Sequence, residues 1–558
     1  MALSSLIAPR LEAAESDVSA LWWPGKAPSN AAKSTISLAL RCFPHASPVS
    51  LTGAGKQKTA PKGIIGENQA YRKSRLLSAQ RGCASLAPVD GQRNTGKIGH
   101  GAGSSASPPG KPMEERLVER EDLEREDLIF VGTCDLSGHL RGKAFPARDL
   151  ESRRHKGVGY TGGNIMMSAF GPIYDNPFGT VGDLALIPDL STKVDVEFAG
   201  FAPERFCLAD IMTAEGEAWP YCPRSFLKRG LEALRTEAGF EILSAFEQEF
   251  VYTGVGDRLG TTYGYDSFRH QGTFGEIFIS AIRRAGATPD TFLPEYAPRQ
   301  YEVTVAPQLN LRAADEAVIV REMARAVAFR LGHRVILSPV VELGAVGNGT
   351  HIHFSLRDPA GQAIMHDPSR PYGISERAEP FVAGIVRHMP ALTALSAPSI
   401  VSYFRLRPNR WAPVWANLAE RDRGAALRVS SIFRKAAEDA GQQFNLEFRV
   451  CDATASPYMA LGALVHAGLD GIRNETRLQT WPTKSVWEMT LEERHAAGIA
   501  DLPGSLAEAL GRLEADEALR ASLGPDLLSA YLRLRASEIN AVKGESDEAI
   551  CARYAAAY

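Results

Sequence analysis

The sequence contains few cysteines, and their positions suit neither a disulfide framework nor a zinc site. Seven cysteines are scattered over 558 residues, and no two of them form a CxxC pair. This pattern is typical of free thiols in a reducing compartment. Long apolar runs are also missing, since no segment approaches the roughly 18 residues that a membrane-spanning helix requires. We therefore expect a cytoplasmic protein that has no membrane partner.

A large excess of basic charge is absent as well. The net charge is -3, from 62 lysines and arginines against 65 acidic residues. Residues 1–110 hold 13 of these basic residues and only 5 acidic ones, so the rest of the chain holds 49 against 60. An acidic main body argues against nucleic acid as a partner, because phosphate backbones are bound by positive surfaces.

Residues 1–112 lack a sustained hydrophobic period. They are rich in alanine, serine, glycine and lysine and end in GHGAGSSASPPGKP. Such a composition cannot bury enough apolar surface to offset the entropy of ordering, so we expect a disordered basic extension. We expect a non-folding extension, of the kind that an upstream start chosen over Met113 would produce, in preference to a transit peptide. Transit peptides avoid acidic residues, and Glu12, Glu15 and Asp17 lie near the N-terminus.

From Met113 the sequence is typical of folded domains. A charged helix is expected first, followed by the strand LIFVGT, the turn DLSG and the strand HLRGKAF. After Pro223, apolar residues recur at helical spacing in FLKRGLEALRTEAG, ADEAVIVREMARAVAFRLG, FVAGIVRHMPALTAL and YMALGALVHAGLDGI. A single core rarely exceeds about 250–300 residues. We therefore predict a small β-rich domain over residues 113–215 and a larger α+β domain over residues 216–558.

Paired polar residues interrupt three otherwise apolar strands. The pairs are Glu247 and Glu249 in AFEQEFVY, His351 and His353 in GNGTHIHFSL, and Glu447 and Arg449 in NLEFRVCD. Residues two apart in a strand face the same side, so each pair projects together. The segment PEYAPRQYEV adds Glu295 and Glu302. Taken singly, a carboxylate pair usually marks a solvated strand face, and two alternating histidines are more often hydrogen-bonded than metal-bound.

The joint occurrence of these pairs indicates a metal site. Unpaired carboxylates are too costly to bury among apolar strands, and metal coordination is one way to offset that cost. Five carboxylates and one histidine suit two hard divalent cations, Mg²⁺ or Mn²⁺. Several arginines follow in SYFRLRPNRWAPVWANLAERDRGAALRV. Two metals with arginines close by favour phosphoryl chemistry, because both neutralise charge on a transferring phosphate.

In these motifs the body of the chain resembles type I glutamine synthetases. The resemblance rests on DLSGHLRGK, EQE, EYAPRQYE, GNGTHIHFSL, SYFRLRP with WAPV, RDRGAALRV and LEFRVCDATASPYMALGALVHAGLDGI, which occur in the family's order from residue 113 onward. It implies an α+β fold, in which a small N-terminal β-grasp-like domain precedes a larger catalytic domain. The catalytic domain is expected to contain an antiparallel sheet with flanking helices.

The resemblance also implies roles for individual residues. Glu249, Glu295 and Glu302 would bind one metal ion, and Glu247, His351 and Glu447 the other. The residues implied near ATP are His353, Ser355 and Arg428. Those implied to hold glutamate are Asn348, Gly349, Arg405 and Arg449. Arg405, Arg423 and Arg449 would act on glutamate and the transferring phosphoryl group.

The implied reaction proceeds through γ-glutamyl phosphate. The γ-carboxylate of L-glutamate attacks the γ-phosphorus of ATP, and an amine then displaces phosphate. Positioning and charge neutralisation carry most of the catalysis in such a transfer. The family's quaternary structure implies a homo-oligomer, a dodecamer of two hexameric rings, in which each active site is completed by the N-terminal domain of a neighbouring subunit.

The sequence departs from the family at the ammonium site. Trp411 replaces the glutamate of a GxEAPV motif, and Thr161 stands at the position expected for an aspartate. Ammonium is small and strongly hydrated, so its capture needs fixed negative charge. A tryptophan offers apolar area and a cation-attracting face instead, which favours a larger primary amine. An alternative interpretation of Trp411 is that it packs in the core and that the local alignment is misleading. The alternatives for the function are a true glutamine synthetase with an unusual ammonium site and a non-catalytic structural relative.

Overall fold

The computed structural model describes residues 125–180, 182–257, 262–432 and 439–558. The disordered extension expected over residues 1–112 and the start of the charged helix expected from Met113 lie outside these ranges. Among the described residues, no helix is both long and apolar enough to cross a membrane.

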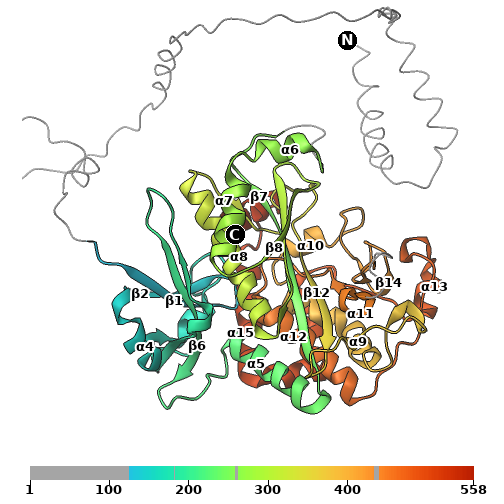
Figure 1. Cartoon of the computed structure of the whole chain (residues 1–558). Helices are drawn as coiled ribbons and strands as arrows, with labels where there is room; N and C mark the ends of the chain where they lie inside the picture. Colours follow the sequence, from blue (N-terminus) through green and yellow to red (C-terminus); the bar gives the residue numbers. More distant parts are fainter. Residues whose placement is uncertain (1–124, 181, 258–261, 433–438) are drawn as a thin grey trace, which may run out of the picture. The chain divides into compact units, whose positions relative to one another are not determined.

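The first part of the described chain forms a six-stranded sheet (Figure 1). Its strands are β1 (Leu128–Cys134), β2 (Leu140–Pro146), β3 (Val158–Thr161), β4 (Asp183–Pro188), β5 (Val194–Val196) and β6 (Glu204–Thr213). Their order is β2-β1-β6-β4-β3, with β5 also paired to β6. The β1–β6 pair is parallel, and the other pairs are antiparallel. The strands predicted in LIFVGT and HLRGKAF are confirmed as β1 and β2.

A nine-stranded sheet follows and carries most of the candidate residues. In sheet order its strands are β14 (Leu418–Glu420), β15 (Leu427–Val429), β16 (Leu446–Phe448), β12 (Thr350–Arg357), β7 (Glu241–Tyr252), β9 (Gln300–Val305) and β8 (Pro289–Pro294). Two short strands, β10 (Gln308–Leu309) and β11 (Val335–Ile336), also pair with β7. All pairs are antiparallel except β14–β15. A separate two-stranded sheet joins β13 (Trp415–Ala416) to β17 (Ala500–Asp501).

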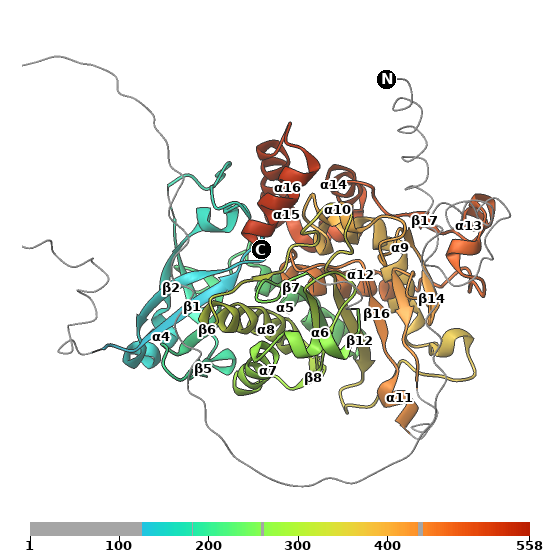
Figure 2. The ribbon, with the colours of Figure 1, turned by 90° about the horizontal axis from the view of Figure 1, so that it is seen from above.

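Helices pack against the six-stranded and the nine-stranded sheet. They are α4 (Leu150–Lys156), α5 (Pro223–Ala233), α6 (Tyr265–His270), α7 (Phe274–Arg284), α8 (Leu311–Arg330), α9 (Glu379–Ser396), α10 (Ser402–Arg405), α11 (Ala440–Gln443), α12 (Pro457–Arg473), α13 (Leu491–Ala496), α14 (Leu506–Ala515), α15 (Glu517–Ala541) and α16 (Asp547–Ala557). Helix α8 packs against β7, and α12 packs against α5, α8, α9 and α15 (Figure 2). The four helices predicted from apolar spacing are confirmed as α5, α8, α9 and α12. The expected α+β class is therefore also confirmed.

A buried arginine connects the six-stranded sheet to the helices that pack against the nine-stranded sheet. Arg224 at the start of α5 is fully buried and donates to Asp315 of α8. It also donates to Asp210 of β6 at 3.0 Å and to Asp189, which follows β4, at 2.6 Å. A guanidinium group out of water needs such anionic partners, so this cluster fixes the first sheet against the helices of the second.

Candidate active site

Five neighbouring strands bring the candidate residues onto one face of the large sheet. Glu249 of β7 lies opposite Glu302 of β9, and Glu247 lies opposite His351 of β12. Glu447 of β16 lies opposite both His353 and Arg428 of β15. Directly opposed residues point to the same side of a sheet, so this register gathers segments that are distant in sequence.

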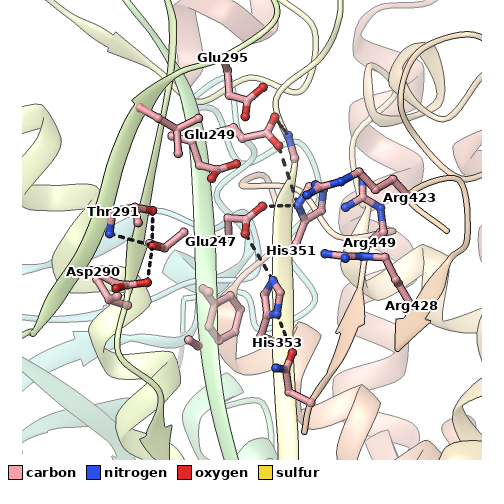
Figure 3. A pocket seen from close by; sticks show the side chains of 18 of the residues that line it. Glu247, Glu249, Asp290, Thr291, Glu295, His351, His353, Arg423, Arg428 and Arg449 are labelled. Atoms are coloured by element: carbon pink, nitrogen blue, oxygen red, sulfur yellow. Dashed lines mark hydrogen bonds and ion pairs between the residues drawn. The ribbon is translucent and has the colours of Figure 1, made fainter. Parts of the chain in front are cut away.

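Strand β7 separates the core from a cavity of about 860 Å³. Its residues alternate in burial, and Phe246 and Phe250 are almost completely buried. Glu247 and Glu249 share the other face and line the cavity, as the alternation predicts. Figure 3 shows these side chains pointing into the same space as His351 and His353.

Two groups of three side chains could each hold one metal ion. Within each group, one ligand atom per residue lies within 4.8 Å of the others. The first group is Glu247, His351 and Glu447, the set expected for the second metal. The other group is Glu247, Glu249 and Glu302, so Glu247 takes the place expected for Glu295. Glu295 lines the same cavity and accepts hydrogen bonds from the Tyr263 hydroxyl at 3.0 Å and the Tyr296 amide at 3.1 Å.

The carboxylates of the two metal groups, together with Glu295, form a row across the sheet, and those at its two ends have opposite pKa shifts. Burial, together with repulsion from neighbouring carboxylates, raises the pKa of Glu249, Glu295 and Glu302, and that of Glu302 the most clearly. Burial also opposes ionisation of Glu447, but Arg449 and the nearby histidines outweigh it and lower its pKa to about 2. Glu247 likewise has a pKa well below its ordinary value despite its burial, because it accepts hydrogen bonds from His351 and His353.

These residues fit divalent cations. Carboxylate oxygens with one imidazole nitrogen are donors that both Mg²⁺ and Mn²⁺ accept. Ligand oxygens of Glu247, Glu249 and Glu302 lie within 4.8 Å of one another, so negative charge is crowded where burial already opposes ionisation of Glu249 and Glu302. A bound cation would remove that repulsion, and the sequence-based expectation of a metal site thereby acquires a physical basis.

The expected arginines all line the cavity but differ in their partners. Arg449 donates to Glu447 at 2.5 Å, and Arg428 also donates to Glu447. Arg405 is buried, and its guanidinium group donates to the carbonyl oxygens of Val450 and, at 3.0 Å, Cys451. Arg423 lies on the cavity wall on the same side as Arg428 and Arg449 (Figure 3).

The residues expected near the nucleotide lie on β12. His353 bonds to Asn445 at 2.9 Å through Nδ1, and its Nε2 is 3.3 Å from a Glu247 carboxylate oxygen. That carboxylate raises the pKa of His353 although burial acts in the other direction. Ser355 is buried and lines the cavity, and its hydroxyl has no hydrogen-bond partner among the described residues.

The expected glutamate-binding loop is only partly in the cavity. Gly349 lines it, and its amide donates to Glu249 at 2.8 Å. Asn348 is buried behind the wall, where its amide nitrogen donates to the Ser338 carbonyl at 2.8 Å and its oxygen accepts from Gln300. The Asn348 side chain is therefore placed to hold the loop and is not among the cavity-lining residues that the structure describes.

The two expected amine-pocket residues lie in different places. Trp411 lines the cavity, with 45% of its surface exposed, and its carbonyl oxygen accepts from Arg449 at 3.3 Å. Thr161 lies at the end of β3, is exposed, and is not among the described residues that line this cavity. Within a single chain, Thr161 and Trp411 therefore do not line the same cavity.

Three further residues at the site were not predicted. Gln300 is buried and donates to Glu249 at 3.2 Å and to the Gly347 carbonyl at 3.0 Å, so it ties a candidate ligand to the loop before β12. Tyr263 and Tyr296 line the cavity beside Glu295. Gln300 and Tyr296 both lie within EYAPRQYE, between the candidate ligands Glu295 and Glu302. This position in the sequence was the signal that could have identified them as site residues.

Known proteins share this arrangement. The description "Glutamine synthetase N-terminal domain" matches residues 112–219, and "Glutamine synthetase, catalytic domain" matches residues 220–554. Gamma-glutamylpolyamine synthetase GlnA3 of Streptomyces coelicolor is 33% identical over 481 residues, which cover 81% of this chain and 98% of that protein. A glutamine synthetase of Thermococcus kodakarensis is 31% identical over 74% of this chain and 88% of its own length.

Solved structures agree with this relationship. A crystal structure described as a novel glutamine synthase homolog superposes with a TM-score of 0.73 at 37% identity, over 78% of this chain and all of that one. A complex of GmaS with ADP gives a TM-score of 0.66 at 26% identity, over 76% of this chain and 95% of that one. Two matched domains, relatives over most of the chain and a shared fold lead to one conclusion: the chain belongs to the glutamine synthetase family of ATP- and metal-dependent carbon–nitrogen ligases.

Proposed function

We propose that the chain joins the γ-carboxyl group of L-glutamate to a primary amine larger than ammonia, at the expense of ATP. The observation that carries the proposal is Trp411, a half-exposed tryptophan on the cavity wall where the family's pattern has a glutamate. An apolar ring favours a carbon skeleton over a bare ammonium ion. The name of the Streptomyces relative, a γ-glutamylpolyamine synthetase, supports an amine acceptor.

In this proposal the row of carboxylates and histidines holds two divalent cations, Mg²⁺ or Mn²⁺. The ligands are Glu247, Glu249, Glu295, Glu302, His351 and Glu447. Bound cations would neutralise the phosphate oxygens of ATP. Glu447 is well suited to such a role, because Arg449 and Arg428 already hold it ionised.

The remaining residues bind and orient the substrates. Arg428, His353 and Ser355 would hold ATP. Arg405, Arg423 and Arg449 would hold glutamate and the transferring phosphoryl group, with Gly349 and Asn348 shaping the loop beside them. The γ-carboxylate oxygen bonds to the γ-phosphorus as the bond to ADP breaks. The amine nitrogen then attacks the acyl carbon, phosphate leaves, and the nitrogen loses a proton.

The test is an amine panel. The full chain is incubated with ATP, Mg²⁺ or Mn²⁺, L-glutamate and one amine at a time, namely ammonia, ethanolamine, putrescine or benzylamine, and phosphate release is measured. We expect the highest kcat/KM with an amine other than ammonia. The highest value with ammonia would establish the alternative, a true glutamine synthetase. No turnover with any amine would favour the non-catalytic relative.

Two variants of Trp411 make this test specific to the residue. Trp411→Glu restores a carboxylate and should raise the use of ammonia at the expense of larger amines. The matched variant Trp411→Leu keeps an apolar side chain and should reduce the use of larger amines without any gain for ammonia. An unchanged amine preference in both variants would remove Trp411 from the proposal.

We also propose a homo-oligomer, a dodecamer of two hexameric rings. The support is the family's assembly together with the position of Thr161, which is exposed and lies outside the cavity of its own chain. A neighbouring subunit would then supply Thr161 to the amine end of the site. The mass of the purified particle, measured by light scattering, tests this assembly, and a monomer with full activity would contradict it.

A further inference from the structure

Three aromatic side chains form one wall of the cavity at the end where Glu295 lies. They are Tyr263, Tyr296 and Trp411, and we call them the aromatic trio. Their exposed fractions are 57%, 41% and 45%, although each is a large ring on the wall of a concave site. Aromatic rings bury most of their area when they serve only the core, so within this chain the three rings leave an apolar surface open toward the cavity, which a ligand can cover.

The rings of the trio contact one another although they come from three separate segments. The Tyr296 and Trp411 rings stack with centroids 5.0 Å apart at an interplanar angle of 26°. The Tyr263 and Tyr296 rings meet edge to face, 5.5 Å apart at 65°. Stacked rings at 5.0 Å leave no space for a third ring between them, so a flat aromatic amine cannot be sandwiched there. A narrow alkyl chain can lie along their outer surface.

Two residues of the trio have backbones in costly conformations. Tyr263 has a φ of 52° and Trp411 a φ of 55°, and both values lie in the left-handed region that non-glycine residues rarely adopt. Such conformations persist where the surrounding structure enforces them, and they cluster at ligand-binding sites. The positions of these two rings are therefore better explained by binding than by local preference.

The surroundings of the trio favour a cation. The Tyr263 hydroxyl donates to Glu295 at 3.0 Å, and the Tyr296 amide donates to the same carboxylate at 3.1 Å. A phenol that donates to a carboxylate has a more electron-rich ring, which attracts a cation more strongly. The Trp411 carbonyl meanwhile accepts from Arg449, a candidate for holding the reacting groups. The trio thus lies next to the proposed reaction centre, on its acidic side.

We propose that the aromatic trio binds the far, positively charged end of the acceptor, so that the preferred acceptor is an alkyl diamine or a longer polyamine. Tyr296, the ring that contacts both others, is then a specificity-determining residue. This inference rests on the proposed function and adds to it the class of amine and the residues that select it. One nitrogen of the amine is neutral and attacks the acyl carbon, while the distal ammonium group lies over the rings.

A pair of isosteric amines tests the charge requirement. Putrescine and pentylamine have the same length. The far end of putrescine is an ammonium group, and the far end of pentylamine is a methyl group. We expect the wild-type chain to favour putrescine over pentylamine in kcat/KM by roughly 5- to 30-fold, the range of an ammonium–ring contact. Tyr296→Leu should reduce this ratio toward one through the KM for putrescine, with KM values for ATP and glutamate within about twofold of wild type.

Matched variants separate this role from a structural one. Tyr296→Phe keeps the ring and should retain most of the preference, and Tyr263→Leu should lower it as Tyr296→Leu does. Tyr265→Leu removes an exposed tyrosine on α6 that is outside the described cavity lining, and it should change nothing. A wild-type ratio near one, higher activity with benzylamine than with putrescine, or a ratio unaffected by Tyr296→Leu and Tyr263→Leu would overturn the inference. The proposed function fails by a different result, which is ammonia as the best acceptor.

Discussion

Replacing Glu447 and Glu302 by glutamine should shift the stability of the metal-free protein in opposite directions. Both residues are buried on the same face of the sheet, and the two substitutions are chemically identical. Glu447 accepts from Arg449 at 2.5 Å and from Arg428. Burial opposes its ionisation, but Arg449, His351 and His353 outweigh this and lower its pKa to about 2. The pKa of Glu302 shifts in the other direction, because burial and repulsion from Glu247, Glu249 and Glu295 raise it.

The magnitudes follow from these surroundings. A carboxyl group that ionises at pH about 2 when folded and near 4.5 when unfolded contributes about 3 kcal/mol to the free energy of unfolding at neutral pH. This contribution is present above pH 4.5 and is lost as the pH falls through 2. Glu447→Gln should therefore destabilise the protein by about 3 kcal/mol. The substitution leaves the buried Arg449 and the half-buried Arg428 without their shared anion, which acts in the same direction.

For Glu302 the effect of the substitution on the free energy of unfolding has the opposite sign. Its raised pKa means that ionisation costs stability, and the cost grows as the pH rises above the ordinary range of a carboxyl group. Its ligand oxygen lies within 4.8 Å of oxygens of Glu247 and Glu249, and each like-charge pair at that distance costs about 3 kcal/mol at an effective dielectric constant near 20. Protonation of Glu302 relieves part of this repulsion in the wild type. We therefore expect Glu302→Gln to stabilise the metal-free protein by about 1–2 kcal/mol at pH 8 and by less at pH 6.

The assay is urea unfolding of the full chain, followed by circular dichroism at one protein concentration in EDTA, and then with Mg²⁺ in excess. In EDTA the two variants should lie on opposite sides of wild type. With Mg²⁺ the wild type should gain stability, and both variants should lose most of that gain because each lacks a ligand. A Glu302→Gln protein that is destabilised in EDTA as strongly as Glu447→Gln would refute the reasoning, since the carboxylates would then not be crowded.

Three further predictions concern residues around the site. Gln300→Ala removes the amide that ties Glu249 to the loop at Gly347, so the Mn²⁺ concentration for half-maximal activity should rise about 10- to 100-fold. Arg224→Met leaves Asp189, Asp210 and Asp315 without their shared cation and should lower the free energy of unfolding by about 3–5 kcal/mol in urea titrations. His388 bonds to Asp516 at 2.7 Å and to Asp470 at 2.8 Å, which raises its pKa although burial opposes this. Its contribution is fully present below pH 6.5 and lost as the pH rises through the raised value, so His388→Asn should destabilise the protein more at pH 6 than at pH 9.

Local patterns in the sequence were sufficient to predict which side chains share a strand face. The alternation in AFEQEFVY places Glu247 and Glu249 together whatever strand lies beside β7, because the period of two is a property of one strand. The same holds for His351 and His353. The helices α8 and α12 were predictable for a similar reason, since their apolar residues recur within a single segment.

Contacts between strands could not be predicted in this way. That Glu302 lies opposite Glu249, and Glu447 opposite His353, depends on sheet order and register, which segments far apart in the chain determine together. The hydrogen bonds of Gln300 and the stacking of Tyr296 on Trp411 likewise need the three-dimensional structure. The left-handed backbone at Trp411 has no sequence signal, because tryptophan does not favour it.

The cavity has two chemically different ends, and this polarity gives the substrates a direction. At one end Arg428, Arg449 and His353 surround Glu447, which leaves cationic groups to meet the phosphates of a nucleotide. At the other end Glu295 accepts hydrogen bonds from the Tyr263 hydroxyl and the Tyr296 amide, and the rings of both tyrosines line the cavity beside Trp411. Glu247 lies between the two, since it belongs to both candidate metal groups. In the function proposed here, transfer from phosphate to amine would therefore pass across Glu247, and Arg449 connects the two ends because it donates both to Glu447 and to the Trp411 carbonyl.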